Sequence, residues 1–583
     1  MVFTLFMFSC QKEESVFVEQ DLLQAENNQT ETILGEKLKN PYSVENMQKA
    51  YEILQQKKQL KSSVNITTTD YYVRFFPKTD DELQILEADS LVLFDYPLDY
   101  EIKQIGDHYN DPEVNPEDGQ WYYTSVPVDY TFPNVEYEIL ENLFLIDEEQ
   151  EEISQKSSND IQFLYELEDE ALKITGNYTE PENEESTRLK RRPSKRNPTG
   201  FVRVFDTERR ALVGVEGVRV RTRRWFSYGY AWTSSIGYYR INRSYRRDVH
   251  YTVFFENSSG FKIRPTLASL WKAKHHVGSH NRSGYTFNIY QNSRAWPFCT
   301  VNNAVVKYRR YCNQFNIGLP HSNLRIVASK RDGSSAAPML KHVWGFLGFT
   351  SKSTIVSFLG KLAGLPATIL NDTFFKFVLP DIIIKAKSSK GTASIYETTF
   401  HELAHASHFK KVGQSFWVKY INYISTYGSY GKGTGNNAGL CALGEAWGYH
   451  MGYRLTLEEF RSVGGRDNSV ITWDGFEDFE PLETGSKDDD IQTFYDPANP
   501  DKRITNWEGW IPAGIMNDII DNNRDFVRAG FWDDVTGYTQ QDLFDALDKD
   551  VDTPQKFRDR LLSENGNRDQ TDLEELFEAY YWN

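Results

Sequence analysis

Residues Ser394–Lys410 read SIYETTFHELAHASHFK, and within this stretch His401, Glu402 and His405 spell the pattern H-E-x-x-H. On a helix, side chains four residues apart lie one turn apart on the same face, so both imidazoles can point at one metal ion. Neutral imidazoles leave the charge of Zn²⁺ intact, and zinc held in this way acidifies water toward neutrality. Glu402, beside the first histidine, is placed to accept the water's proton. The stretch therefore predicts one zinc site with its own general base.

The surrounding sequence favours one long helix. Ile395, Phe400 and Leu403 are spaced for a single apolar side, and no Pro or Gly interrupts residues 392–412 before Gly413. The alternative interpretation of the two histidines is a solvated pair on the outer face of this helix.

A catalytic zinc needs a third protein ligand, and the extended pattern H-E-x-x-H-x-x-G-x-x-H does not supply it. His408 stands where that pattern requires glycine, and Lys411 stands at its third-ligand position. We interpret His408 as an outer histidine or one that neighbours the ligands, and not as a ligand itself. The third ligand must come from elsewhere in the chain.

A second apolar helical pattern lies at 438–453, which read AGLCALGEAWGYHMGY with a single carboxylate, Glu445. A charge among Leu443, Ala446 and Trp447 is costly to bury unless it is paired or bound to a metal. Glu445 is therefore the best candidate for the third ligand. The alternative is a core carboxylate paired with an Arg or Lys.

At this point the chain resembles the gluzincin metallopeptidases, in which two histidines of H-E-x-x-H and a glutamate on a later helix bind zinc. The resemblance implies that His401, His405 and Glu445 are the ligands and that Glu402 is base and proton shuttle. It also implies a mainly helical α+β, zincin-like catalytic domain, which we expect at 266–583. One departure is Tyr449, because the thermolysin-like branch has aspartate four residues after the glutamate.

Such a site also needs a hydrogen-bond donor for the developing oxyanion, usually Tyr or His. His450, Tyr449 and Tyr396 are the nearest candidates in sequence; the sequence does not choose among them, and a residue from the C-terminal lobe could equally serve. By the same resemblance, the run DIIIK at 381–385 is a candidate for an edge strand that pairs with extended substrate.

The composition excludes some functions. The 583 residues are 39% hydrophobic and 14% aromatic, which indicates a folded chain of several domains. A net charge of −18 argues against general nucleic-acid binding, since phosphates would be repelled by most of the surface.

The chain begins MVFTLFMFSC, an apolar run that ends at Cys10. We interpret residues 1–10 as the remnant of a lipoprotein signal, with Cys10 as the lipidated residue, and 11–40 as a flexible tether. The cluster QKEE after Cys10 resembles the surface-export signal of lipoproteins in some Gram-negative outer membranes. We therefore expect a lipid-anchored surface protein; the alternative is a cytosolic protein with an apolar start.

Three further segments precede the expected catalytic domain. Residues 41–175 alternate aromatic runs with acidic turns and predict an N-terminal α+β domain, and 176–198 is a charge-dense linker. Residues 199–265 alternate apolar and polar positions with regular turns, which predicts a small β-sandwich. Its pattern resembles the carboxypeptidase regulatory-like, prealbumin-type domain, whose role is usually accessory.

Within this region, Arg219, Arg221 and Arg223 alternate along one strand. We interpret them as a solvated face, and the alternative is a wall that binds acidic glycans or the lipid surface.

Two other groups have open interpretations. His275, His276 and His280 invite a second metal, but their spacing is irregular and no carboxylate lies near them in sequence. Cys299 and Cys312 are either a disulfide or two buried thiols.

Taken together, these patterns predict zinc-dependent hydrolysis of peptides or proteins by a membrane-attached enzyme that does not bind nucleic acid. The sequence does not determine its oligomeric state. The alternative is a non-catalytic surface binding or adhesion lipoprotein with a peptidase-like fold.

Overall fold

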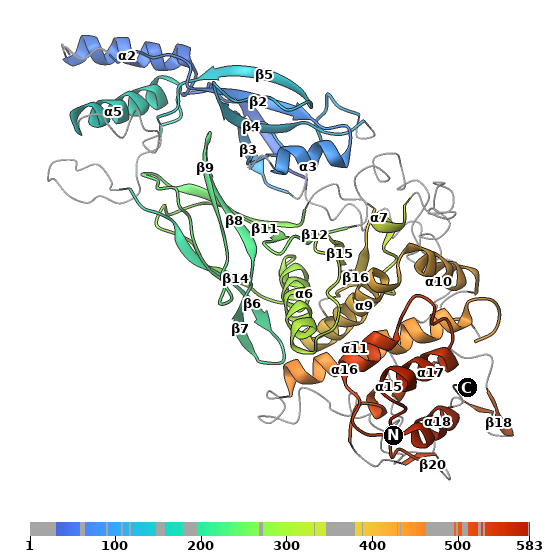
Figure 1. Ribbon diagram of the computed structural model, residues 1–583. Coiled ribbons are helices and arrows are strands. Elements are labelled where there is room, and N and C mark those ends of the chain that lie inside the picture. The colour runs from blue at the N-terminus through green and yellow to red at the C-terminus, as the bar shows by residue number, and fades with distance from the viewer. Residues whose placement is uncertain are drawn as a thin grey trace, which may run out of the picture.

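A computed structural model shows a mixed α+β protein with several sheets and more than one domain (Figure 1). It describes residues 31–58, 64–88, 91–106, 109–115, 118–146, 158–178, 195–266, 272–330, 333–344, 379–387, 389–427, 430–431, 433–461, 495–496, 499–503, 511–512, 514–522, 526–528, 531–580 and 582. Cys10 and the predicted signal remnant lie outside these residues, as does most of the predicted linker. Among the described helices, none has both the length and the apolar character needed to cross a bilayer.

The N-terminal part is an antiparallel sheet with helices beside it. Strand β2 (Asp70–Phe76) lies between β4 (Tyr122–Pro127) and β5 (Glu136–Leu143). The helices of this part are α2 (Val44–Lys58), α3 (Asp80–Ala88) and α5 (Ser158–Ile174). Buried residues from the sheet and from α2 and α5 form a core that is separate from the core of the rest of the chain.

The tether predicted for residues 11–40 ends earlier than expected. Strand β1 (Ile33–Lys37) pairs with β3 (Tyr100–Gln104), and the amide of Leu38 donates to the Asp99 carbonyl at 2.7 Å. The polar composition of this stretch concealed a short edge strand, because its pairing partner lies more than sixty residues away.

Two sheets follow, built from the strands of residues 199–289 and from two later strands, β15 and β16. In the smaller sheet, β6 (Thr199–Asp206) pairs with β7 (Ala211–Gly214), β10 (Tyr238–Arg240) and β14 (Phe287–Ile289). Every second residue of β6 is buried, as the alternation in its sequence predicts. The larger sheet has the order β16-β15-β12-β11-β8-β9, with β13 on β11. Its strands are β8 (Val218–Arg224), β9 (Ser227–Trp232), β11 (Val249–Asn257), β12 (Lys262–Arg264), β13 (Lys274–His280), β15 (Arg325–Ser329) and β16 (Ile382–Lys385).

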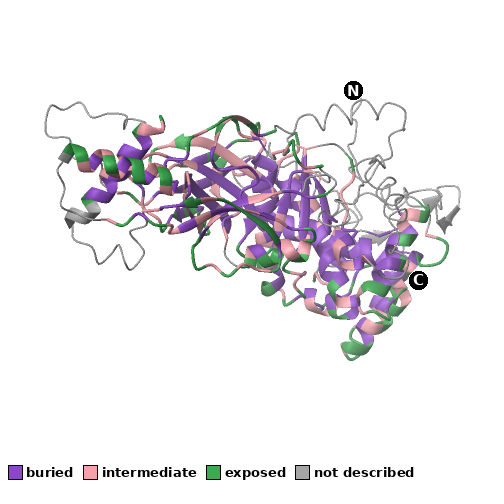
Figure 2. Cartoon of the chain, turned by 90° about the horizontal axis from the view of Figure 1, so that it is seen from above, coloured by how far each residue is buried: buried purple, intermediate pink, exposed green. Residues whose placement is uncertain are grey.

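The larger sheet continues across the domain boundary expected at residues 265 and 266. Strand β12 pairs in parallel with β15, and β15 pairs in parallel with β16. Buried residues from Val202 to Trp582 form one hydrophobic core, which Figure 2 shows as a continuous purple interior of strands and helices. The strands of 199–265 and the helices after them therefore share one folded body.

The helices of this body lie on one side of the larger sheet and beyond it (Figure 1). They are α6 (Trp296–Gln314), α7 (Leu340–Val343), α9 (Thr392–Val412), α10 (Gln414–Tyr427), α11 (Ala438–Phe460), α15 (Ile515–Asp518), α16 (Gln540–Ala546), α17 (Pro554–Glu564) and α18 (Gln570–Ala579). Two short antiparallel ladders complete this region: β17 (Tyr495–Asp496) with β18 (Asn499–Arg503), and β19 (Phe526–Arg528) with β20 (Phe531–Trp532).

The arginines of β8 are not a solvated face, contrary to the expectation from sequence. The Arg221 guanidinium lies 3.8 Å from the centre of the Phe94 ring and donates to the Leu93 carbonyl at 3.1 Å. Arg223 donates to the Leu98 carbonyl at 2.6 Å. A planar guanidinium can stack on an aromatic ring and still donate hydrogen bonds at its edge. Arg221 and Arg223 therefore join the larger sheet to the N-terminal part.

The structure also distinguishes between the interpretations of Cys299 and Cys312 and of the three histidines of β13. Cys299 and Cys312 are free and buried, and thirteen residues along α6 separate them by about 20 Å. His276 Nδ1 lies 2.9 Å from the Thr252 hydroxyl, whereas the His280 ring stacks on Tyr285. In the described part of the chain, these histidines have separate neighbours and do not form a metal site.

Candidate metal centre

The predicted helix forms as α9, with Gly391 before its first residue and Gly413 after its last. Gly413 has φ 82°, a conformation that glycine adopts without strain, so the helix ends there. The side of α9 that carries Ile395, Phe400 and Leu403 is buried in the shared core. The helix is thereby held along its length while His401 keeps a side chain that is 16% exposed.

Three candidate ligand atoms converge between α9 and α11. The Nε2 atoms of His401 and His405 lie 3.0 Å apart, and Glu445 Oε2 lies 3.3 Å from the first and 3.6 Å from the second. Ligands at 2.0–2.1 Å from a tetrahedral zinc stand about 3.3 Å from one another, so these separations fit one ion. Within the described residues, these three side chains are the group of acidic, histidine or cysteine residues that could hold a metal.

Glycines on α11 allow the two helices to approach this closely. A methyl group at Gly448 would lie 2.8 Å from His401 Cε1 and 3.0 Å from His405 Cε1. One turn later, a methyl group at Gly452 would lie 3.1 Å from the Glu397 carbonyl. The helices therefore run antiparallel, and Gly448 leaves the imidazoles the space that a larger residue would occupy.

Glu445 is buried, and its Oε2 atom faces both imidazoles at ion-pair distance. Its other oxygen, Oε1, accepts a hydrogen bond from the hydroxyl of Tyr420 on α10. Burial alone would raise the pKa of Glu445, but the histidines outweigh burial and hold that pKa well below its usual value. This environment suits a carboxylate that stays ionised beside a cation, and it differs from a core carboxylate paired with Arg or Lys.

Glu402 is buried at the same site. Burial raises its pKa to about 8; His401 opposes this shift and the charge of Glu445 adds to it. Its Oε2 atom has no hydrogen-bond partner among the described residues. A buried carboxylate oxygen without a partner is costly, so this atom is available to a water or a ligand.

The three candidate oxyanion donors have different surroundings in the structure. The Tyr449 ring centre lies 5.0 Å from that of His401, and its hydroxyl donates to the Tyr430 hydroxyl at 2.8 Å. His450 turns away, with Nε2 2.8 Å from Gln540 Oε1. Tyr396 packs between Phe400 and Phe460. Residues 396 and 450 each lie five positions from a ligand, which places them on another side of their helices.

His408 is neither a ligand nor an outer residue. Its ring packs against Phe416 and Trp417, and burial lowers its pKa to about 3. Lys411, at the third-ligand position of the extended pattern, instead donates to the Phe544 and Asp545 carbonyls at 2.5 Å each.

The predicted substrate-pairing strand is already paired on its outer side. Ile383 of β16 exchanges two backbone hydrogen bonds with Ala336, at 2.8 and 3.0 Å, and the Met339 amide donates to the Asp381 carbonyl at 3.0 Å. All four residues of β16 are buried. In this structure, residues 335–340 occupy the position that an extended substrate would need.

Sequence reasoning missed two parts of the site. Tyr420 lies in a helix whose pattern predicts only an apolar side, and nothing in its neighbours marks it as a partner of Glu445. Gly448 had a signal, because glycines at 444, 448 and 452 recur with the spacing of one helical face.

Comparison with known proteins gives no family: no family model, curated protein or solved structure matches this chain.

Proposed function

We propose that this protein is a zinc-dependent peptidase whose ligands are His401, His405 and Glu445. The observation that carries the proposal is the convergence of two imidazole nitrogens and one carboxylate oxygen at separations of 3.0, 3.3 and 3.6 Å. The H-E-x-x-H motif and its resemblance to gluzincins support peptides or proteins as the substrate class. The pair α9 and α11 would then be the centre of a zincin-like fold, with a sandwich-like arrangement of the β-strands as an accessory part.

A zinc ion bound there supplies a Lewis acid that polarises a carbonyl and acidifies water. Glu402 accepts a proton from the attacking water and donates it to the leaving amine. Its buried Oε2, free of other partners among the described residues, supports this role. Of the three candidate oxyanion donors, we favour Tyr449, because its ring centre lies 5.0 Å from that of His401; to donate to the oxyanion, its hydroxyl would exchange the hydrogen bond that it donates to Tyr430.

The test compares the native chain with Glu402→Gln and Glu445→Gln for zinc content and for cleavage of a peptide library. We expect Glu402→Gln to keep its zinc and to lose about 10²–10⁴-fold in rate, since only the proton transfer is removed. Glu445→Gln should lose zinc as well, because a ligand is weakened. A chelator should abolish cleavage, and added zinc should restore it.

Two outcomes would contradict the proposal. If the native chain binds zinc but cleaves nothing in the library, the alternative of a surface binding protein is favoured. If Glu445→Gln binds zinc as tightly as the native chain, Glu445 is not a ligand. Attachment through a lipid at Cys10 stays a separate prediction, checked by mass spectrometry of the mature N-terminus.

A further inference from the structure

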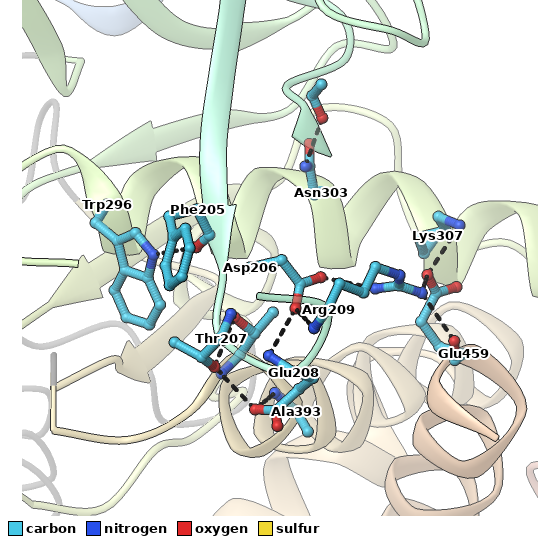
Figure 3. Close-up of polar contacts among 12 residues, drawn as sticks. Phe205, Asp206, Thr207, Glu208, Arg209, Trp296, Asn303, Lys307, Ala393 and Glu459 are labelled. Carbon is cyan, nitrogen blue, oxygen red and sulfur yellow. Dashed lines mark hydrogen bonds and ion pairs between the residues drawn. The ribbon is translucent and has the colours of Figure 1, made fainter. Parts of the chain in front are cut away.

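The turn after strand β6, residues Asp206–Arg209, contacts both helices that carry the ligands. It lies where the N-terminal end of α9 meets the C-terminal end of α11 (Figure 3). We call these four residues the β6 turn. Helix α6 also contacts both helices, through Tyr308 to the Ser407 hydroxyl of α9 at 2.9 Å and through Tyr311 to Glu459 of α11 at 2.9 Å. The β6 turn is a further tie, made at the ends of the two helices and separate from their own contact.

The β6 turn provides hydrogen bonds to the first residues of α9. The Thr392 amide donates to the Thr207 hydroxyl at 2.7 Å, and the Thr207 amide donates to the Thr392 hydroxyl at 2.9 Å. The Ala393 amide donates to Glu208 Oε1 at 3.1 Å. These amides belong to the group that a helix leaves without partners, and the carboxylate has the sign that a helix N-terminus favours.

The same turn provides a cation to the end of α11. Arg209 donates to the Glu459 carbonyl at 2.9 Å and to its carboxylate at 2.8 Å. The Glu459 carboxylate is also 3.0 Å from Lys307 Nζ and accepts from the Tyr311 hydroxyl at 2.9 Å. Arg209 thus satisfies a terminal carbonyl of α11, and the Glu459 carboxylate joins the last turn of α11 both to the β6 turn and to α6.

Hydrogen bonds within the β6 turn hold Thr207, Glu208 and Arg209 in place. Asp206 is buried, and its Oδ1 accepts from the amides of Glu208 and Arg209 at 2.9 and 3.0 Å. Its Oδ2 accepts from the Arg209 guanidinium at 2.7 Å. Because β6 itself lies within a four-stranded sheet, the turn is anchored at its base.

The position of this tie matters because the ligands lie along the same helix pair. His401 faces Gly448, and Glu397 faces Gly452, so the two helices have one antiparallel register. A slide of α11 by a single residue would move Glu445 by about 1.5 Å relative to the imidazoles. That displacement is large against ligand distances that vary by only about 0.2 Å in a metal site.

We propose that the β6 turn is a positioning element that fixes the register of α9 against α11, so that metal affinity at His401, His405 and Glu445 depends on it. This inference rests on the proposed metal site. It assigns the strand region a direct part in the site, because the residues that hold the ligand helices come from β6.

The test uses the full chain and measures the zinc dissociation constant by competition with a chelator. Thr207→Val keeps the shape of the side chain and removes the hydroxyl that binds Thr392, and Thr207→Ser restores the hydroxyl. Arg209→Met removes the cation from α11. The matched control is Thr233→Val, because the buried Thr233 likewise accepts from a backbone amide at 3.0 Å and donates to a carbonyl at 2.7 Å within the strand region.

We expect Thr207→Val and Arg209→Met each to weaken zinc binding at least tenfold, Thr207→Ser to recover it, and Thr233→Val to leave it unchanged. The absorption spectrum of bound Co²⁺ should change in the first two variants, since ligand geometry changes with register. Thermal unfolding without metal checks that each variant is folded. If Thr207→Val does not fold, the inference is tested with Arg209→Met.

Equal zinc affinity in the native chain, Thr207→Val and Arg209→Met would overturn the inference and leave the proposed metal site standing. An equal loss in Thr233→Val would also overturn it, because the effect would then be general destabilisation. If the native chain binds no zinc, the metal site and the inference both fail.

Discussion

At the scale of single residues, the site depends on how each charged or polar atom is satisfied. Glu445 is surrounded by apolar residues of α11, yet one of its oxygens faces two imidazoles and the other accepts from Tyr420. Groups that hold a metal ligand in place contribute to affinity even though they do not touch the metal. At the proposed metal site Tyr420 would have this role for Glu445, and its ring is itself packed on Trp417.

Replacing Tyr420 by Phe tests this role. The ring packing is kept, but the carboxylate loses its donor, so we expect zinc affinity to fall by about 10–100-fold. Chelator competition measures the change. The control is Tyr427→Phe, on the same helix but half exposed, which should bind zinc like the native chain. Equal affinity of Tyr420→Phe and the control would show that the hydroxyl does not orient Glu445.

At the scale of elements, the decisive feature is the contact of α9 with α11. Gly444, Gly448 and Gly452 lie on one face of α11, and this face meets Tyr420, the imidazoles and the backbone of α9 in turn. Glycine inside a helix costs about 1 kcal/mol relative to alanine. Glycine is nevertheless needed at position 448, because the imidazoles lie too close to it for any larger residue.

Gly448→Ala should therefore separate stability from metal binding. The added methyl group favours the helix but would lie 2.9 Å from His401 Nε2, so we expect weaker zinc binding and little or no loss of thermal stability. Gly444→Ala is the comparison, because the atoms nearest to its methyl group would be those of Tyr420, at 3.3 to 3.6 Å, and not those of the imidazoles. If Gly448→Ala binds zinc as well as Gly444→Ala does, the space around the imidazoles is not limiting.

At the scale of the whole molecule, an acidic N-terminal part docks on a basic face of the larger sheet. Asp95 pairs with Lys274 at 2.7 Å, and both side chains are buried. Glu87 of α3 pairs with Lys272 at 2.6 Å and with Lys262. With the arginines of β8, these pairs explain why the basic residues of this sheet are not available to an acidic surface outside the protein.

Acid should weaken this docking. Burial alone would raise the pKa of Glu87, but Lys272 and Lys262 outweigh burial and lower it to about 2. A carboxylate whose pKa is lower in the folded state adds stability that is present above about pH 4.5 and is lost as the pH falls toward 2. The full effect of this group is on the order of 3 kcal/mol.

The measurement is the urea midpoint of unfolding between pH 7 and pH 2.5. The midpoint of the native chain should fall more steeply below pH 4.5 than that of Glu87→Gln, which has no carboxylate to protonate. Glu45→Gln removes an exposed carboxylate that also pairs with a lysine, Lys49, and should follow the native curve. Parallel curves for the native chain and Glu87→Gln would show that protonation of Glu87 does not cause the loss of stability in acid.

The sequence by itself determined helix α9, through its spacing and Gly413, and it named the residues of the candidate centre, His401, Glu402, His405 and Glu445, through a motif and a lone carboxylate in an apolar helix. These signals are local, because helical periodicity relates residues three or four apart. Only the tertiary structure decided that the strand region and the later helices share one core, and it decided the covered edge of β16, the docked arginines, the contact of Tyr449 with the His401 ring and the contacts of Tyr420 and the β6 turn. Each of these depends on which distant segments meet, and the physical reason is that hydrophobic burial favours many pairings, whereas packing and hydrogen-bond geometry select one of them.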